Sequence, residues 1–166
     1  MSDKIALFTG SFDPITLGHV ELIARASHLF DKLYVGLFYN REKEGFFSID
    51  AKERMVRAAL AHLENVEVIV SQGELAVAVA RRLGATTIVR GLRNATDLDY
   101  ETNLQFYNRD LAPEVDTVYL VSGMAYQQVS STRVRELIAF GQDIRAYVPM
   151  SVVEEVERLD DRDKED

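Results

Sequence analysis

A ten-residue segment near the N-terminus, Gly10-Ser11-Phe12-Asp13-Pro14-Ile15-Thr16-Leu17-Gly18-His19, contains residue types that suit phosphate binding. It follows an apolar strand expected over residues 4–9 and precedes apolar residues that repeat with helical spacing over 20–26. The free N–H groups at the start of that helix, with the positive end of the helix dipole, favour an anion such as a nucleotide phosphate. His19 falls in the first turn, where it can donate a hydrogen bond to that phosphate.

Three residues of this segment are expected to shape the loop itself. Gly10 can adopt backbone angles closed to other residues, Pro14 stiffens the middle, and Gly18 allows a close approach of backbone or ligand. The segment matches neither the dinucleotide-binding Gly-x-Gly-x-x-Gly pattern nor the Gly-x-x-x-x-Gly-Lys-Ser/Thr pattern of P-loop proteins. A Thr-x-Gly-His sequence alone would be read as an ordinary strand-to-helix connection, but the preceding Gly-Ser-Phe-Asp-Pro strengthens the phosphate interpretation.

Strands and helices alternate along the rest of the chain, as expected for an α/β protein. The pattern predicts strands over residues 4–9, 32–38, 66–70, 86–89 and 117–121. It predicts helices over residues 20–26, from Ser48 or Asp50 to about Leu63, over 75–83, and over 96–110. Right-handed βαβ units then give a single Rossmann-like domain with a doubly wound, five-stranded parallel sheet. Ligands of such sheets bind at the carboxyl ends of the strands.

Cations and small polar residues follow several of these strands. Lys43 comes after the second strand, residues 90–93 (Arg-Gly-Leu-Arg) after the fourth, and residues 122–132 after the fifth. For Lys43, a solvated loop lysine is an equally good interpretation. Arg90 directly ends an apolar strand, where an unpaired cation is costly, so a phosphate partner is expected.

The segment Val129-Ser-Ser-Thr-Arg-Val-Arg-Glu136 is a second candidate phosphate site. It places three hydroxyl residues at a helix start, followed by Arg133 and Arg135. Helix capping needs only one hydroxyl, so three beside two arginines suit a triphosphate. His28 and His62 are interpreted as structural or surface residues, and no Asp, Glu or His set has a tight metal-binding spacing.

Composition limits the class of protein further. The 166 residues are 47% apolar and contain no cysteine, which fits one domain over residues 1–159 in a reducing compartment. The net charge of −8 argues against a nucleic acid as main partner. The sequence shows neither a leader pattern nor a membrane-spanning apolar run, so a cytoplasmic protein is expected. Residues 160–166 are interpreted as a disordered acidic tail.

These motifs together resemble the bacterial phosphopantetheine adenylyltransferases, a family of the nucleotidylyltransferase superfamily with the T/H-x-G-H signature. The resemblance spans nearly the whole chain. Thr-x-Gly-His identifies only the superfamily, whereas the 90–93 and 130–132 blocks at their spacing narrow it to this family. It implies that ATP and 4′-phosphopantetheine react to dephospho-coenzyme A and pyrophosphate, with Mg²⁺ carried on the ATP phosphates. It also implies a homohexamer.

The resemblance assigns roles to particular residues. It implies that His19, Lys43, Arg93 and Ser11 are catalytic and that Ser11, Lys43, Ala76 and Arg90 contact the acceptor. The residues implied to bind ATP are Ser11, Phe12, His19, Gly91, Leu92, Arg93, Glu101, Tyr126, Gln127, Gln128, Val129, Ser130, Ser131 and Thr132. No residue is assigned to a metal.

The chain also departs from the family pattern, and other functions stay open. Thr9 replaces the usual proline, Leu17 replaces a common asparagine, and the loop at 40–44 is unusually acidic, which puts the role of Lys43 in doubt. A nucleotidylyltransferase acting on nicotinate mononucleotide or glycerol phosphate would share the first loop. A catalytically silent nucleotide-binding sensor is the alternative outside the enzymes.

Overall fold

The computed structural model describes residues 2–165 as one parallel five-stranded sheet with the order β3-β2-β1-β4-β5. The strands are β1 (Ile5–Gly10), β2 (Lys32–Tyr39), β3 (Val66–Gln72), β4 (Thr87–Leu92) and β5 (Asp116–Val121). The helices are α1 (Leu17–Ser27), α2 (Ile49–Leu60), α3 (Ala76–Leu83), α4 (Ala95–Leu111), α5 (Ser131–Ala139) and α6 (Met150–Asp163), with a 3₁₀ turn η1 (Met124–Tyr126). The predicted Rossmann-like α/β fold is therefore confirmed.

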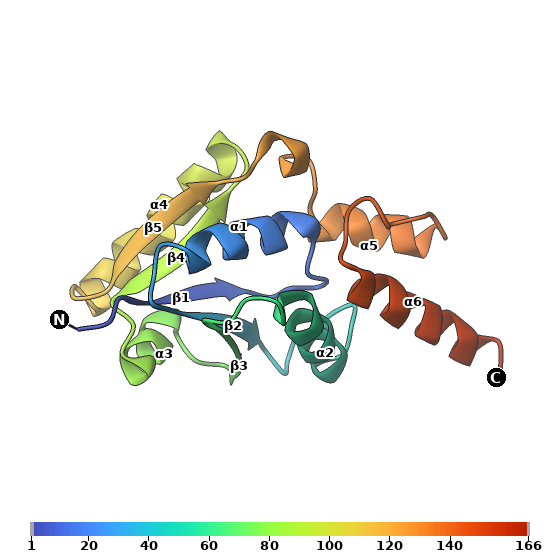
Figure 1. Ribbon diagram of the computed structural model, residues 1–166, viewed down its shortest axis with the longest axis horizontal. Coiled ribbons are helices and arrows are strands. Elements are labelled where there is room, and N and C mark those ends of the chain that lie inside the picture. Colours follow the sequence, from blue (N-terminus) through green and yellow to red (C-terminus); the bar gives the residue numbers. More distant parts are fainter. Residues whose placement is uncertain (1, 166) are drawn as a thin grey trace.

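Helices cover the sheet on both faces, and two hydrophobic clusters fill the layers between them. The larger cluster joins α1, α2, α5 and α6 to one face, with Phe8, Leu33 and Val35 among its fully or nearly buried residues. The smaller one joins α3 to the other face through residues such as Leu7 and Val79. Figure 1 shows α1 and α3 on opposite sides of β1, and α5 and α6 beyond the end of the sheet.

The order in which successive strands join the sheet reverses between β1 and β4, although all strands are parallel. The chain moves outward from β1 through β2 to β3 and then returns to place β4 on the other side of β1. This is the switch point at which parallel sheets bind ligands, because the loops after the two adjacent strands leave in opposite directions. The loop after β1 and the segment after β4 therefore border the same crevice.

Several element bounds differ from the sequence-based expectation, most clearly at β4 and α6. β4 continues to Leu92 because Arg90, Gly91 and Leu92 pair with β5, so the Arg-Gly-Leu part of the 90–93 block lies inside the strand. The helix α6 extends four residues into the expected acidic tail, up to Asp163. Its buried face packs against α2, where Glu155 bonds Arg54 at 3.1 Å. None of the described helices is long and apolar enough to cross a membrane.

Candidate active site

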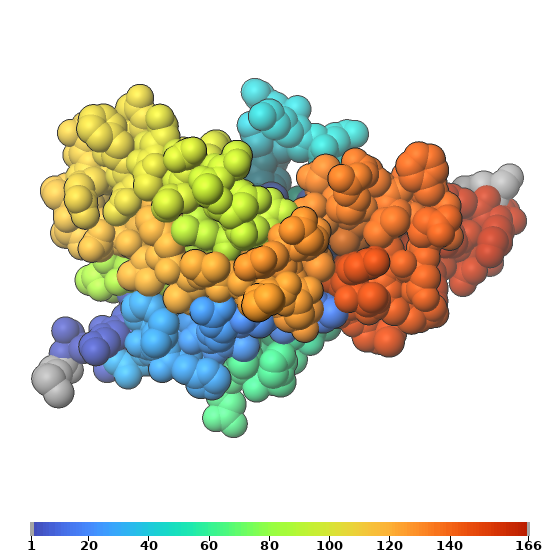
Figure 2. Space-filling model, turned by 90° about the horizontal axis from the view of Figure 1, so that it is seen from above, coloured from blue at the N-terminus to red at the C-terminus, as the bar shows by residue number. Residues whose placement is uncertain are grey.

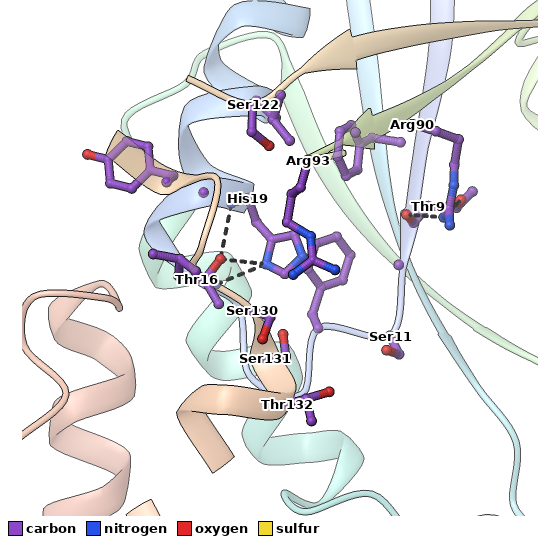
Figure 3. Close-up of a pocket in the computed structure, with 18 of the residues that line it drawn as sticks. Thr9, Ser11, Thr16, His19, Arg90, Arg93, Ser122, Ser130, Ser131 and Thr132 are labelled. Carbon is purple, nitrogen blue, oxygen red and sulfur yellow. Dashed lines mark hydrogen bonds between the residues drawn. The ribbon is translucent and has the colours of Figure 1, made fainter. Parts of the chain in front are cut away.

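The loop after β1 presents His19 through the cap of α1. Thr16 is the N-cap residue, and its hydroxyl accepts a hydrogen bond from the His19 backbone N–H at 3.3 Å. In return, the Thr16 backbone N–H donates to Nδ1 of the His19 ring at 3.0 Å. This reciprocal capping box uses histidine at the position where glutamate or glutamine is usual. The first turn of the helix thus fixes the orientation of the imidazole (Figure 3).

The hydrogen bond to Nδ1 also fixes the protonation state of His19. A backbone N–H can only donate, so Nδ1 must accept and the ring proton lies on Nε2. Burial, and next the nearby charges of Arg93 and Arg90, lower the pKa of His19 from 6.5 to about 4. His19 is therefore neutral near pH 7, with an N–H at Nε2 that can donate to a ligand.

The loop requires glycine at position 10 for lack of space, and not for the unusual backbone angles expected from the sequence. The residue with a positive φ of 48° is Phe12, not Gly10. A Cβ at position 10 would lie 2.9 Å from the Phe12 ring, so Gly10 is needed for space. The Phe12 ring, 2% exposed, packs edge-on against His19 with 5.1 Å between ring centres. Local strain at Phe12 thus accompanies a contact that supports the imidazole.

Arg90 is held by protein groups on two sides. Its Nε and one terminal nitrogen bond the Glu101 carboxylate at 2.7–3.1 Å. Its other terminal nitrogen bonds the carbonyl and the hydroxyl of Thr9 at 2.8 and 2.7 Å. The sequence-based premise that Arg90 is an unpaired cation is wrong, because Glu101 on α4 neutralises it. Its burial alone therefore gives no argument for a phosphate.

Arg93 lies nearer to His19 and is paired less tightly. Its Nε lies 3.3 Å from Asp97 of α4, and its backbone N–H bonds the same oxygen at 2.9 Å. The Arg93 side chain is 38% exposed and extends toward the His19 ring (Figure 3). No residue of the described range 2–165 bonds its two terminal nitrogens, which can therefore bind an anion in the crevice.

The three hydroxyl residues at the start of α5 have distinct partners. Ser130 caps the helix by accepting from the Arg133 N–H at 3.1 Å. Ser131 donates to the carbonyl of Pro14 at 2.7 Å, which ties α5 to the first loop. The hydroxyl of Thr132 accepts from Arg135 at 3.2 Å. One hydroxyl therefore caps the helix, as predicted. Ser131 attaches the helix to the first loop, and Thr132 contacts an arginine of the same helix.

These segments enclose a cavity of about 370 Å³, here called the central cavity. Its polar lining consists of hydroxyl groups, one neutral imidazole and three arginines, and no carboxylate lines it. These polar residues are Thr9, Ser11, Thr16, His19, Arg90, Arg93, Ser122, Tyr126, Ser130, Ser131, Thr132 and Arg135. Figure 3 shows side chains from the first loop, β4 and α5 around the same space. Such a lining is suited to a polyanion.

Two further cavities adjoin the central cavity. The loop cavity, about 670 Å³, shares Ser11 and Arg135 with it and adds Asp13, Lys43 and Lys52. The α4 cavity, about 240 Å³, shares Thr9 and Arg90 with it and adds Ala76, Glu101, Leu104 and Tyr119 among others. In Figure 2 the surface is hollowed between the cyan loop after β2, the yellow-green β4–α4 segment and the orange α5 segment. The three cavities adjoin one another at these shared residues, and together they are here called the groove.

The structure brings together most of the residues that the sequence singled out. The central cavity is lined by Ser11, Phe12, His19, Arg90, Gly91, Arg93, Tyr126, Val129, Ser130, Ser131 and Thr132. Lys43 lines the loop cavity, whereas Ala76 and Glu101 line the α4 cavity. Leu92, Gln127 and Gln128 line none of the three cavities.

Arg135, which the sequence placed in the second candidate phosphate site, lines both the central and the loop cavity and donates to the Asp13 carbonyl at 2.8 Å. Two other cavity residues were given no individual role from the sequence. Thr16 and Ser122 also line the central cavity. The capping pattern, with threonine three residues before His19, could have identified Thr16. Ser122 has no such local signal, because its place depends on the end of β5.

The donor set of the groove is compatible with a metal ion that travels on a ligand. Within residues 2–165, no group of three or more His, Cys, Asp or Glu side chains could hold a metal. The hydroxyls of the central cavity can bond water or phosphate but do not form a carboxylate cage. These residues fit Mg²⁺ coordinated mainly by phosphate oxygens and water.

Comparison with known proteins found a matching family model and relatives that share one name. The model of a family described as cytidylyltransferase-like matches residues 7–137. A phosphopantetheine adenylyltransferase of Streptococcus sanguinis (strain SK36) is 68% identical over 161 residues, covering 97% of this chain and 98% of its own. One of Streptococcus gordonii (strain Challis) is 69% identical over 158 residues, covering 95% and 96%.

A solved structure supports the fold independently. A crystal structure from Vibrio parahaemolyticus, named provisionally as a nicotinate-nucleotide adenylyltransferase, matches with a TM-score of 0.69. The match covers 93% of this chain and 91% of that one at 21% sequence identity. At this identity the likeness concerns the Rossmann-like fold alone.

Proposed function

The chain belongs to the phosphopantetheine adenylyltransferases, nucleotidyltransferases of coenzyme A biosynthesis in the cytidylyltransferase-like family, and we propose how its groove carries out the transfer. An oxygen of the 4′-phosphopantetheine phosphate attacks the α-phosphorus of ATP in line with the departing pyrophosphate. One P–O bond forms and one breaks, giving dephospho-coenzyme A. Because one phosphoanhydride replaces another, the reaction is reversible.

The observation that carries this proposal is the lining of the central cavity. It combines three arginines, a neutral histidine and several hydroxyls, with no carboxylate or cysteine to act as a nucleophile. An acceptor phosphate is already anionic at neutral pH and needs no base to activate it. Catalysis then consists of positioning the two substrates and stabilising the charge that develops on the phosphates.

The central cavity is the proposed place of the ATP phosphates. The Nε2–H of His19 donates to an oxygen on the α-phosphorus, where it stabilises the transition state. Arg93 and Arg135 neutralise the departing pyrophosphate, and the N-terminus of α5 with Ser130 and Thr132 adds donors. The remaining proposed ATP contacts are Ser11, Phe12, Gly91, Leu92, Tyr126, Gln127, Gln128, Val129 and Ser131. Glu101, also expected to bind ATP, bonds Arg90 in the structure.

The acceptor is proposed to bind on both sides of Arg90. Ser11 and Arg90 line the central cavity where the acceptor phosphate would face ATP, and Lys43 can reach it from the loop cavity. The α4 cavity next to Arg90 contains Ala76, Ile88 and Leu104, which suits the less polar pantetheine arm. Lys43 would thus assist the transfer together with His19 and Arg93.

Mg²⁺ is proposed as the metal ion of the reaction. It supplies positive charge to the ATP phosphates when bound. The protein's own part is to hold the phosphate oxygens with His19, Arg93 and Arg135, and to bond metal-bound water with the hydroxyls of Ser130 and Thr132. This division fits a cavity lined by cations and hydroxyls.

The oligomeric state is proposed to be a homohexamer in the cytoplasm. The support for association is α4, whose only buried residue is Glu101 among those described. The helix exposes the large apolar or aromatic side chains of Leu98, Tyr100, Leu104, Phe106, Tyr107 and Leu111 by 39–71%. Such a patch on a monomer is unusual and is typical of an interface. Sedimentation at micromolar concentration tests this, and a mass near the 18.8 kDa of one chain would contradict it.

Pyrophosphate release with a panel of acceptors tests the proposed reaction. With ATP and Mg²⁺, we expect release on addition of 4′-phosphopantetheine and none with pantetheine, which lacks the attacking phosphate. Dephospho-coenzyme A with pyrophosphate should form ATP. Turnover with nicotinate mononucleotide or glycerol phosphate in place of 4′-phosphopantetheine would contradict the proposed acceptor. ATP binding without turnover on any acceptor would indicate a sensor.

A further inference from the structure

Two carboxylates of α4, Glu101 and Asp97, lie one helical turn apart and contact the two arginines of the 90–93 block. We propose that both are positioning residues: Glu101 orients Arg90 for the acceptor phosphate, and Asp97 orients Arg93 for the ATP phosphates. This inference rests on the proposed function and gives Glu101 a role other than direct ATP binding.

The contacts of Arg90 leave little freedom to its side chain. Glu101 accepts from Nε and from one terminal nitrogen, and both carboxylate oxygens take part. Thr9 accepts twice from the other terminal nitrogen, through its carbonyl and its hydroxyl. Since a guanidinium has five N–H donors, these contacts leave about one N–H of Arg90 to meet a ligand. The direction of that N–H is fixed before the ligand binds.

The burial of Glu101 argues against a direct contact with ATP. Its side chain is 8% exposed, it lines the α4 cavity, and it does not line the central cavity. A backbone contact also holds this turn of α4. The Tyr119 hydroxyl donates to the Glu101 backbone carbonyl at 3.2 Å. The charge of Arg90 compensates the negative charge that Glu101 brings to this buried place.

The pairing is one of the polar contacts that hold α4 on the sheet. Glu101 is the one buried residue of this 17-residue helix within the described chain, and the Tyr119 hydroxyl of β5 also bonds Gln105 at 3.2 Å. The inner face of the helix carries Asp97 and Glu101, whose spacing of four residues places them on the same side. The two acids therefore couple the position of α4 to the directions of both arginines.

Thr9 holds Arg90 through its side chain as well as through its backbone. Here the Thr9 side chain, 9% exposed, accepts from Arg90 at 2.7 Å. The hydroxyl thus adds an anchor for Arg90 on the strand opposite α4.

Steady-state kinetics of Glu101→Ala and Asp97→Ala test the proposal, because the two variants should affect different substrates. Without Glu101, the ligand has to order the Arg90 side chain, so we expect the KM for 4′-phosphopantetheine to rise about tenfold and the KM for ATP to change less than about twofold. For Asp97→Ala we expect a rise in the KM for ATP or a fall in kcat of about tenfold, with the acceptor KM unchanged. Glu101→Gln, which keeps one acceptor oxygen, should lie between Glu101→Ala and the unmodified enzyme.

A double-mutant cycle separates positioning from a general loss of structure. If Glu101 acts through Arg90, adding Glu101→Ala to Arg90→Ala should raise the acceptor KM no further. Glu53→Ala is the matched control, because it breaks an exposed pair with Arg57 on α2 and should leave both KM values unchanged. Thr9→Val removes the hydroxyl without touching α4, and we expect a rise of about threefold in the acceptor KM.

Several outcomes would overturn the proposal. A rise in the ATP KM for Glu101→Ala equal to or larger than that of the acceptor KM would make Glu101 an ATP ligand. A lower acceptor KM would mean that its charge opposes phosphate binding, and equal changes in both KM values would indicate a structural role. If Glu101→Ala does not fold, an unchanged acceptor KM in Thr9→Val contradicts the proposed positioning of Arg90. Turnover of 4′-phosphopantetheine by the unmodified enzyme tests the proposed function separately.

Discussion

The loop after β1 and the loop after β2 both supply side chains that we propose to be functional, but they hold them very differently. In the first loop, Phe12, Ile15 and Thr16 are 0–2% exposed, and hydrogen bonds from Ser131 and Arg135 attach its backbone to α5. In the second loop, residues 40–46 are all exposed. Its far end is attached where the Asp13 carboxylate accepts from the backbone N–H groups of Phe46 and Phe47 at 2.7 and 3.0 Å.

This difference indicates how the two substrates are handled. His19 has a fixed tautomer and orientation before ligands arrive, which is what stabilisation of a transition state requires. If Lys43 binds the acceptor as proposed, its side chain has to be ordered on binding, and that ordering costs part of the binding free energy. Changes in the first loop should therefore lower kcat, and changes in the second should raise the KM of the acceptor.

The largest effect is expected for His19→Ala. Loss of one preorganised donor should lower kcat by roughly 10²–10³-fold while ATP affinity changes little. Steady-state kinetics combined with equilibrium ATP binding measure both quantities. His28→Ala serves as control, since His28 lies at the C-terminal end of α1. Weakened ATP binding with an unchanged kcat would refute the transition-state role and remove the contrast between the loops.

A smaller and different effect is expected for Lys43→Ala. Loss of one exposed cation should raise the KM for 4′-phosphopantetheine about tenfold, with kcat at saturation reduced much less than in His19→Ala. Arg41→Ala is the matched control, because Arg41 is exposed in the same loop and lines none of the three cavities. Equal effects of both variants would reduce Lys43 to a general surface charge.

Asp13→Asn should weaken the link between the two loops. The amide has one acceptor oxygen and would place N–H groups against a backbone N–H, so one of the two bonds to Phe46 and Phe47 is lost. We expect the acceptor KM to rise about threefold. The same change in the Lys43→Ala background should add little, and a full additional rise would show that Asp13 acts elsewhere.

The smallest expected effect concerns pH. With the pKa of His19 lowered to about 4, kcat/KM should show no inflection from this residue above about pH 5.5. Because the unfolded chain binds the His19 proton near pH 6.5 and the folded chain only near pH 4, stability should fall as pH drops through this range. An NMR titration of the His19 ring, assigned with His19→Gln, measures the pKa. A midpoint near 6.5 would contradict the preorganised neutral ring.

The sequence by itself determined the elements that hydrophobic spacing and local capping specify. The helix at 96–110 and the end of α3 at Gly84, which has a φ of 71°, follow from residues close to one another in the chain. The prediction that the first loop and the 130–132 block bind phosphate rested on equally local signals. Periodicity did not set the end of the fourth strand, because β4 is prolonged by its pairing with β5.

Only the tertiary structure decided how the charges are shared. Arg90 and Glu101 are 11 residues apart, and Thr9 is 81 residues from Arg90, so no local pattern shows that they form one network. The neutral state of His19 likewise depends on burial and on the positions of Arg93 and Arg90. Residue types and spacing can indicate that an anion binds, but which cation remains free to bind it depends on partners that folding brings together.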